Sequence, residues 1–128
     1  MAYNVLIVDD SQTTRGMIRR VLGLTGLPLG EIWEAENGLT GLEAMRANWV
    51  DVVLADLNMP DMTGQEMIGK MAEDPLLAKL PVIVVSSEGN QSILDSLTSL
   101  GVKEILRKPF SPAFLKDTLV RVLGSAVS

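Results

Sequence analysis

Five polar residues with complementary chemistry each follow a short apolar run. Asp9 and Asp10 come directly after one run, and Asp56 ends a second. A hydroxyl group, Ser86, and an amine, Lys108, end two further apolar segments. Each of these side chains lies just past the carboxyl end of a segment that reads as a buried strand. Their regular placement indicates one site, built where several strands end.

Three carboxylates in one pocket repel one another, because like charges a few ångströms apart disfavour joint ionisation. A divalent cation relieves this repulsion. Oxygen ligands in a chain without histidine or cysteine favour Mg²⁺, with Mn²⁺ as a substitute. Because Mg²⁺ usually couples protein carboxylates to phosphate oxygens, the pocket is typical of a phosphoryl site rather than a structural metal site.

The remaining groups fit phosphoryl transfer. Lys108 is a compact positive charge that can pair with a phosphoryl oxygen, and Ser86 can donate a hydrogen bond to another. One carboxylate would be the nucleophile, since aspartyl phosphates are known covalent intermediates. Such a reaction depends mainly on positioning and on neutralising charge.

The elements that must position these groups alternate between apolar runs and segments of helical period. The expected strands span residues 4–8, 31–35, 50–55, 82–85 and 103–106. The expected helices have cap residues or first turns at Ser11, Asn37, Thr63 with Glu66 as a capping box, Asn90, and Ser111 with Pro112. The runs at 50–55 and 82–85 are apolar on both faces, as a parallel sheet between helices requires.

Five βα units predict an α/β, flavodoxin-like, doubly wound sandwich, with a five-stranded parallel sheet in the order 2-1-3-4-5 and helices on both faces. In this order, the direction in which successive strands are added across the sheet reverses between the first and third strands. Ligands bind at such a reversal, beyond the carboxyl ends of the strands. The topology therefore places Asp9 and Asp10 beside Asp56, with Ser86 and Lys108 approaching from the last two strands.

Length and composition limit the possible classes. The chain has 128 residues, 47% of them hydrophobic, and no linker-like segment, so we expect one domain over residues 1–128. A net charge of −5 disfavours nucleic-acid binding. We interpret the basic cluster Arg15, Arg19 and Arg20 as a solvated helix face, and Trp33 and Trp49 as packing residues at strand ends. With no signal peptide and no membrane-length apolar run, we expect a cytoplasmic protein that does not enter a membrane.

Four motifs in this order carry a family resemblance. They are Val-Asp-Asp-Ser from residue 8, Asp-Leu-Asn-Met-Pro-Asp-Met-Thr-Gly from residue 56, Ser-Ser-Glu from residue 86 and Lys-Pro-Phe from residue 108. Along its whole length the chain resembles receiver domains of two-component response regulators, in particular the stand-alone chemotaxis type. The resemblance implies a phosphorylation-activated signalling switch that catalyses only its own phosphorylation and dephosphorylation, rather than a classical enzyme.

The resemblance also implies roles for single residues. Asp56 would accept the phosphoryl group from a histidine kinase. Asp10, Asp56 and the backbone carbonyl of Asn58 would bind Mg²⁺, with Asp9 acting through water. Ser86 would be the switch hydroxyl, and Lys108 the phosphoryl-binding lysine. Asn58 and Glu88 match the chemotaxis type at the two positions that flank the water attacking the phosphoryl group, which implies a short-lived signal.

One position departs from the family pattern. Receiver domains often carry an aromatic residue shortly before the lysine, whereas this chain has Ile105 three residues before Lys108. We therefore expect signalling to rely on the loop at residues 86–89 and on a shift of the fourth helix. The resemblance implies an output protein that docks on the face formed by helix four, strand five and helix five, and a monomer when unphosphorylated.

Several alternatives remain open. A flavodoxin-like ligand binder would share the fold, but its phosphate loop would replace the acidic pair Asp9-Asp10. A P-loop enzyme needs a motif that is missing from this sequence, and a haloacid-dehalogenase-type phosphatase needs an Asp-x-Asp pattern that Asp56-Leu57-Asn58 breaks. Within the family, the chain could instead be a phosphorelay intermediate or the receiver part of a longer regulator.

Overall fold

The structure is a computed structural model that describes residues 2–57, 62–86, 91–100, 102, 104–108 and 110–127. Its strands and helices alternate strictly along the chain. In chain order they are β1 (Tyr3–Val8), α1 (Gln12–Gly23), β2 (Leu29–Ala35), α2 (Gly38–Ala47), β3 (Val52–Ala55), α3 (Gly64–Glu73), β4 (Val82–Ser86), α4 (Gln91–Ser99), β5 (Glu104–Arg107) and α5 (Pro112–Val127).

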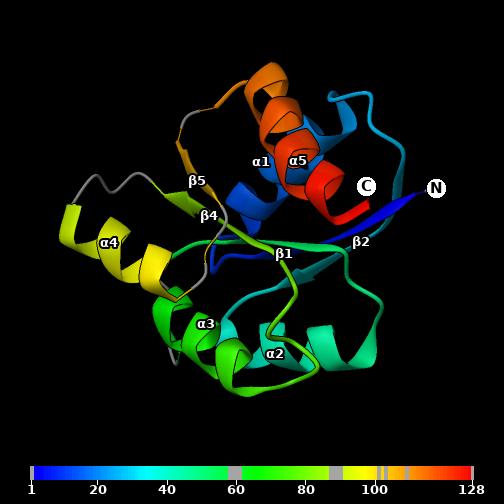
Figure 1. The fold of residues 1–128 in the computed structure, drawn as a ribbon. Helices are drawn as coiled ribbons and strands as arrows, with labels where there is room; N and C mark the ends of the chain where they lie inside the picture. Colours follow the sequence, from blue (N-terminus) through cyan, green and yellow to red (C-terminus); the bar gives the residue numbers. More distant parts are fainter. Residues whose placement is uncertain are drawn as a thin grey trace.

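The five strands form one parallel sheet in the order β2-β1-β3-β4-β5, which confirms the predicted topology (Figure 1). The register brings the strand ends level with one another. Val8 at the end of β1 pairs with Ala35 of β2 on one side and with Ala55 of β3 on the other. The residues that directly follow Val8 and Ala55 therefore emerge side by side at the carboxyl edge of the sheet.

The helices cover both faces of the sheet, as predicted. Helices α1 and α5 lie together on one face, and α2, α3 and α4 lie on the other (Figure 1). Side chains alternate along each strand, so each central strand contributes to two hydrophobic layers. Leu6 and Val53 belong to the layer under α2 and α3, whereas Ile7 and Leu54 belong to the layer under α1 and α5. This two-sided core holds the strand ends in place.

The predicted helix caps are present in four of the five helices. The side chains of Ser11, Asn37 and Thr63 each accept a hydrogen bond from the backbone N–H three residues later. Glu66 returns a bond to the backbone N–H of Thr63 at 3.1 Å, which completes the predicted capping box. Ser111 caps α5 in the same way. Three of these helices start directly after the loops that carry the polar strand-end residues.

Some element boundaries differ from the prediction by one or two residues. The third strand begins at Val52 rather than at residue 50. Asp51, just before it, is also joined to β1: its backbone N–H donates to the carbonyl of Asn4 at 2.8 Å, and its carboxylate accepts the backbone N–H of Asn4 at 2.7 Å. The second strand begins earlier, at Leu29, and the fifth is shifted by one residue. The expected start of helix four at Asn90 lies outside the described residues.

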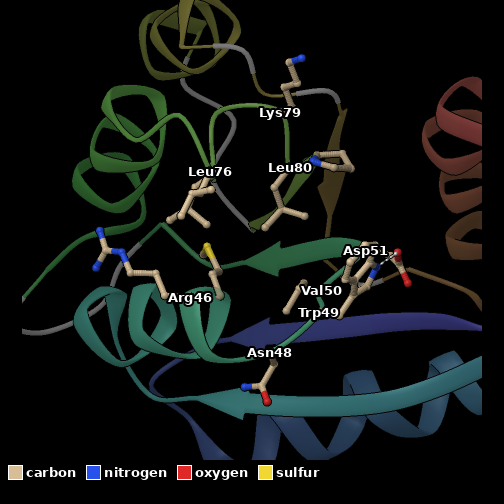
Figure 2. A pocket seen from close by; sticks show the side chains of 11 residues that line it. Arg46, Asn48, Trp49, Val50, Asp51, Leu76, Lys79 and Leu80 are labelled. Carbon is tan, nitrogen blue, oxygen red and sulfur yellow. Dashed lines mark hydrogen bonds between the residues drawn. The ribbon is translucent and has the colours of Figure 1, made fainter.

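A shallow hollow of about 510 Å³ lies at the amino edge of the sheet, opposite the strand ends that carry the polar residues (Figure 2). Trp49 and Leu76 line it and are largely exposed. The prediction that Trp49 is a packing residue is therefore wrong: it is 79% exposed, and its indole N–H donates to Asp51 at 3.3 Å. Trp33, in contrast, packs half-buried against the core.

None of the helices in the described ranges has the length and apolar character that a bilayer-spanning segment needs.

Candidate functional site

The three predicted carboxylates meet at the carboxyl edge of the sheet. Asp9, Asp10 and Asp56 each offer an oxygen atom, and these atoms all lie within 4.8 Å of one another. Asp9 is 2% exposed, the side chain of Asp56 is 14% exposed, and Asp10 faces solvent. The cluster thus has a buried side at Asp9 and an exposed side at Asp10, from which a ligand can approach.

Asp9 is fixed by contacts from three directions. Its backbone N–H donates to the carbonyl of Ala35 at 3.0 Å, which extends the β1–β2 ladder by one step. Its Oδ1 accepts the backbone N–H of Ser11 at 2.9 Å, and its Oδ2 lies 3.4 Å from Nζ of Lys108. These bonds offset the cost of burying a charged carboxylate.

Asp56 is fixed by the end of β3 and by the start of α3. Its backbone N–H donates to the carbonyl of Val8 at 2.9 Å, and its Oδ1 accepts the N–H of Leu57 at 2.7 Å. Gly64, the first residue of α3, packs so closely that a Cβ atom there would collide with the Asp56 carbonyl oxygen. The glycine therefore allows α3 to begin directly beside the backbone of Asp56.

Lys108 brings the only amine that lies within salt-bridge distance of the cluster in the described part of the chain. Its Nζ lies 3.4 Å from Asp9 Oδ2 and 4.0 Å from Asp56 Oδ2, and its side chain is 23% exposed. Its backbone N–H donates to the carbonyl of Ser86 at 3.0 Å. Ser86 ends β4 and is almost fully buried. The structure thus brings Asp9, Asp10, Asp56 and Lys108 together, with Ser86 on the adjacent strand end.

The donor set fits a hard divalent cation. Its oxygen atoms all belong to carboxylates, and the chain has no histidine or cysteine that would favour a softer metal. Three carboxylates against one ammonium group leave a formal excess of two negative charges (−3 + 1 = −2). One Mg²⁺ ion would neutralise this excess, and Mg²⁺ prefers such oxygen ligands.

Two predicted residues, Asn58 and Glu88, lie outside the described residues. Ile105, on β5, is half-buried against the core layer under α2 and α3. Together with Phe110 and Phe114 it lines a hollow of about 430 Å³ between β5 and the start of α5. Phe114 is largely exposed there. The predicted output position therefore borders a surface hollow that is rich in aromatic side chains.

Sequence reasoning missed the role of Arg15. The sequence predicts a solvated helix face for this residue, but its side chain is only 14% exposed. Its Nε pairs with Glu34 at 3.0 Å, and its Nη1 donates to the backbone carbonyl of Asp9. Helical period gives no sign of this contact. The useful signal was Glu34 near the end of β2, because the strand order places β2 beside the strand that leads to Asp9.

Comparison with known proteins agrees with this geometry. Residues 5–120 match the model of the response regulator receiver domain. The chain is 34% identical over 122 residues to the chemotaxis protein CheY1 of Helicobacter pylori. This alignment covers 94% of this chain and 97% of that protein. It is 35% identical to a CheY homolog of Campylobacter jejuni, with 94% and 92% covered. The structure of Vibrio cholerae CheY4 superposes with a TM-score of 0.86 at 31% identity, covering 96% of this chain and 100% of that one. The chain therefore belongs to the response regulator receiver domain family.

Proposed function

We propose that this receiver domain is a Mg²⁺-dependent signalling switch whose Asp56 accepts a phosphoryl group from a histidine kinase. One observation carries the proposal: three carboxylates with oxygens within 4.8 Å of one another, with the Lys108 ammonium 3.4 Å from Asp9 and 4.0 Å from Asp56. A phosphoryl group needs a nucleophile, a cation and positive side-chain charge at one place, and this edge of the sheet supplies a binding place for each.

The transfer itself needs little chemistry from the protein. A carboxylate oxygen of Asp56 attacks the phosphorus of a phosphohistidine; the new O–P bond forms as the P–N bond breaks, and the departing imidazole keeps the electron pair and takes a proton from water. The hydrogen bond from Leu57 N–H fixes the plane of the attacking carboxylate. Lys108 pairs with one phosphoryl oxygen, and Ser86 donates a hydrogen bond to another. Bound Mg²⁺ would offset the negative charge on the phosphoryl oxygens.

The switch returns to its resting state when water attacks the phosphorus of the phosphorylated Asp56. The O–P bond to water forms as the P–O bond to Asp56 breaks, which restores the carboxylate and releases inorganic phosphate with the protons of the water. By family resemblance, Asn58 and Glu88 flank this water and set the lifetime of the signal. In the same way, the Asn58 carbonyl would complete the ligands of the metal. The chain thus catalyses only its own phosphorylation and dephosphorylation, over one domain of residues 1–128.

The output surface in this proposal is the face made by α4, β5 and α5. Its support is the hollow beside Ile105, which exposes the aromatic ring of Phe114 next to the last strand. Because Ile105 is aliphatic, the switch works without a swinging aromatic ring at that position. Similarity to CheY chemotaxis proteins along 94% of the chain supports a chemotaxis-type regulator that binds an output protein.

The phosphoacceptor is tested by intact-mass spectrometry after incubation with acetyl phosphate and Mg²⁺. The wild type is expected to gain the mass of one phosphoryl group, and the Asp56→Asn variant to gain none. Asp51→Asn is the matched control, because this carboxylate lies at the opposite end of the sheet, where it bonds to Asn4 and Trp49. Equal labelling of the wild type and Asp56→Asn would exclude Asp56 as the acceptor.

A phosphorelay intermediate and the receiver part of a longer regulator are the alternatives within the family. The decay time of the phosphorylated protein separates the first from a fast switch. Rapid loss of the phosphoryl group supports the chemotaxis type, and slow loss with transfer to a histidine protein supports the relay. Phosphotransfer from a panel of histidine kinases would identify the donor.

A further inference from the structure

Arg15 lies beside the acidic cluster and bonds to the backbone of Asp9 rather than to the carboxylates. Its guanidinium group bridges two parts of the chain: Nε pairs with Glu34 on β2, and Nη1 donates to the carbonyl oxygen of Asp9. The side chain is largely buried for a residue in the first turns of a surface helix. A planar guanidinium with several donors in fixed directions suits such a bridge.

The Asp9 carbonyl belongs to the peptide group that joins Asp9 to Asp10. The other polar groups of Asp9 are held by Ala35, Ser11 and Lys108, so the Arg15 contact completes the fixation of this residue. A fixed peptide plane also fixes the direction in which the chain enters Asp10. This matters because Asp10 is exposed, and its carboxylate must point to the same place as those of Asp9 and Asp56.

Glu34 keeps Arg15 in place and offsets part of its charge. Its Oε1 lies 3.0 Å from Arg15, and its Oε2 lies 2.9 Å from Nη2 of Arg19. Arg19 also donates to the carbonyl of Ile32, and its side chain is about half exposed. A guanidinium group without an acidic partner beside a metal site would repel Mg²⁺ and oppose its binding. Paired with Glu34, the guanidinium can orient the Asp9 carbonyl with less repulsion of Mg²⁺ than a guanidinium without an acidic partner would cause.

We infer that Arg15, held by Glu34, is a positioning residue of the acidic site: it fixes the Asp9–Asp10 peptide group and thereby strengthens Mg²⁺ binding. This inference rests on the proposed Mg²⁺ site. Groups that orient metal ligands without touching the metal typically change metal affinity by about 10–100-fold when they are removed. A purely structural ion pair between α1 and β2 would stabilise the fold and leave the affinity unchanged.

The sign of the effect separates positioning from simple charge. Removing Arg15 takes away one positive charge near the acidic cluster, which by electrostatics alone would make Mg²⁺ bind more tightly. Loss of positioning makes Mg²⁺ bind more weakly. Arg19→Ala is the matched control, because it removes the other partner of Glu34 without touching Asp9.

The experiment measures the Kd of Mg²⁺ by isothermal titration calorimetry on the full chain, for the wild type, Arg15→Ala, Arg15→Lys and Arg19→Ala, together with their melting temperatures without Mg²⁺. We expect Arg15→Ala to raise the Kd by about tenfold, and Arg19→Ala to leave it unchanged. Arg15→Lys should recover part of the affinity, because an ammonium group can reach the carbonyl but cannot bridge as a guanidinium does. It also serves as the second test if Arg15→Ala does not fold.

The outcomes separate the two levels of the proposal. A wild type that binds no Mg²⁺ at millimolar concentration would overturn the metal site itself. A wild type that binds, with an equal or lower Kd in Arg15→Ala, would overturn the positioning role alone. An equal loss of affinity in Arg15→Ala and Arg19→Ala would also overturn it, because the effect would then not depend on the Asp9 carbonyl.

Discussion

Replacing Lys108 by methionine tests how much the acidic cluster depends on one positive charge. The Lys108→Met variant keeps an unbranched side chain of similar length and removes the ammonium group. Asp9 would then remain buried without its ion-pair partner, beside two further carboxylates. We predict that without Mg²⁺ the variant unfolds more easily than the wild type, and that Mg²⁺ stabilises the variant more than it stabilises the wild type.

The size of the effect follows from the two ion-pair distances. At the 3.4 Å and 4.0 Å separations of Lys108 from Asp9 and Asp56, unit charges attract by about 5 and about 4 kcal/mol at an effective dielectric constant of about 20. Desolvation of the charges offsets much of this attraction, so breaking a buried pair by removing one partner costs about 3–5 kcal/mol. Because the lysine side chain is 23% exposed, we expect about 2–3 kcal/mol here. For a domain of this size, that lowers the melting temperature by roughly 8–12 °C.

Thermal melts followed by circular dichroism, with EDTA and then with excess Mg²⁺, measure both effects. Lys79→Met is the matched control, because Lys79 is an exposed lysine beside the hollow at the opposite edge of the sheet. In an Asp56→Asn background, Lys108→Met should cost less, since one of its two partners is already neutral. Equal melting temperatures of Lys108→Met and the wild type in EDTA would refute the idea that the ammonium group offsets the repulsion among the three carboxylates.

Three further predictions concern the fold and the metal. Gly64→Ala should destabilise the protein by about 1–3 kcal/mol, because the added Cβ collides with the Asp56 carbonyl. Urea unfolding would show this as a lower midpoint concentration, and an unchanged midpoint would contradict the close approach. Leu54→Ala should cost about 2–5 kcal/mol, because Leu54 is fully buried under α1 and α5, whereas Leu76→Ala on the exposed rim should cost little. Mg²⁺ at a hundred times its Kd should stabilise the wild type by about 2.7 kcal/mol, and a melt that does not change with Mg²⁺ would count against the metal site.

The positions of the strands and of the site could be predicted because two signals agree at each strand end. An apolar run stops and a chemically active residue follows at once, as at Asp9, Asp56 and Lys108. Parallel strand order then brings these ends to one edge of the sheet. The helix caps at Ser11 and Thr63 could also be predicted from the sequence, because each depends on neighbours within three residues. Local chemistry and a simple topology were therefore sufficient for most of the fold.

The features that were missed depend on contacts between distant parts of the chain. Arg15 reads as a solvated helix residue until Glu34, nineteen positions later, is placed beside it. The bond from the backbone N–H of Asn4 to the carboxylate of Asp51 joins residues that lie forty-seven positions apart. Trp49 is hydrophobic enough to suggest packing, but the loop that carries it leaves its indole at the surface. No local pattern encodes these outcomes, since each is decided by which neighbour the fold supplies.

The placement of the two tryptophans gives the unlabelled protein two optical reporters at different depths. Trp49 is open to solvent at the amino edge, so a water-soluble quencher such as iodide can reach its indole directly. Trp33 is half-buried on β2, two residues before Ala35, whose carbonyl holds the backbone of Asp9. The emission that survives quenching therefore comes mainly from the strand that adjoins the acidic residues. Its intensity and wavelength can follow events at that edge, while the quenched fraction follows the opposite one.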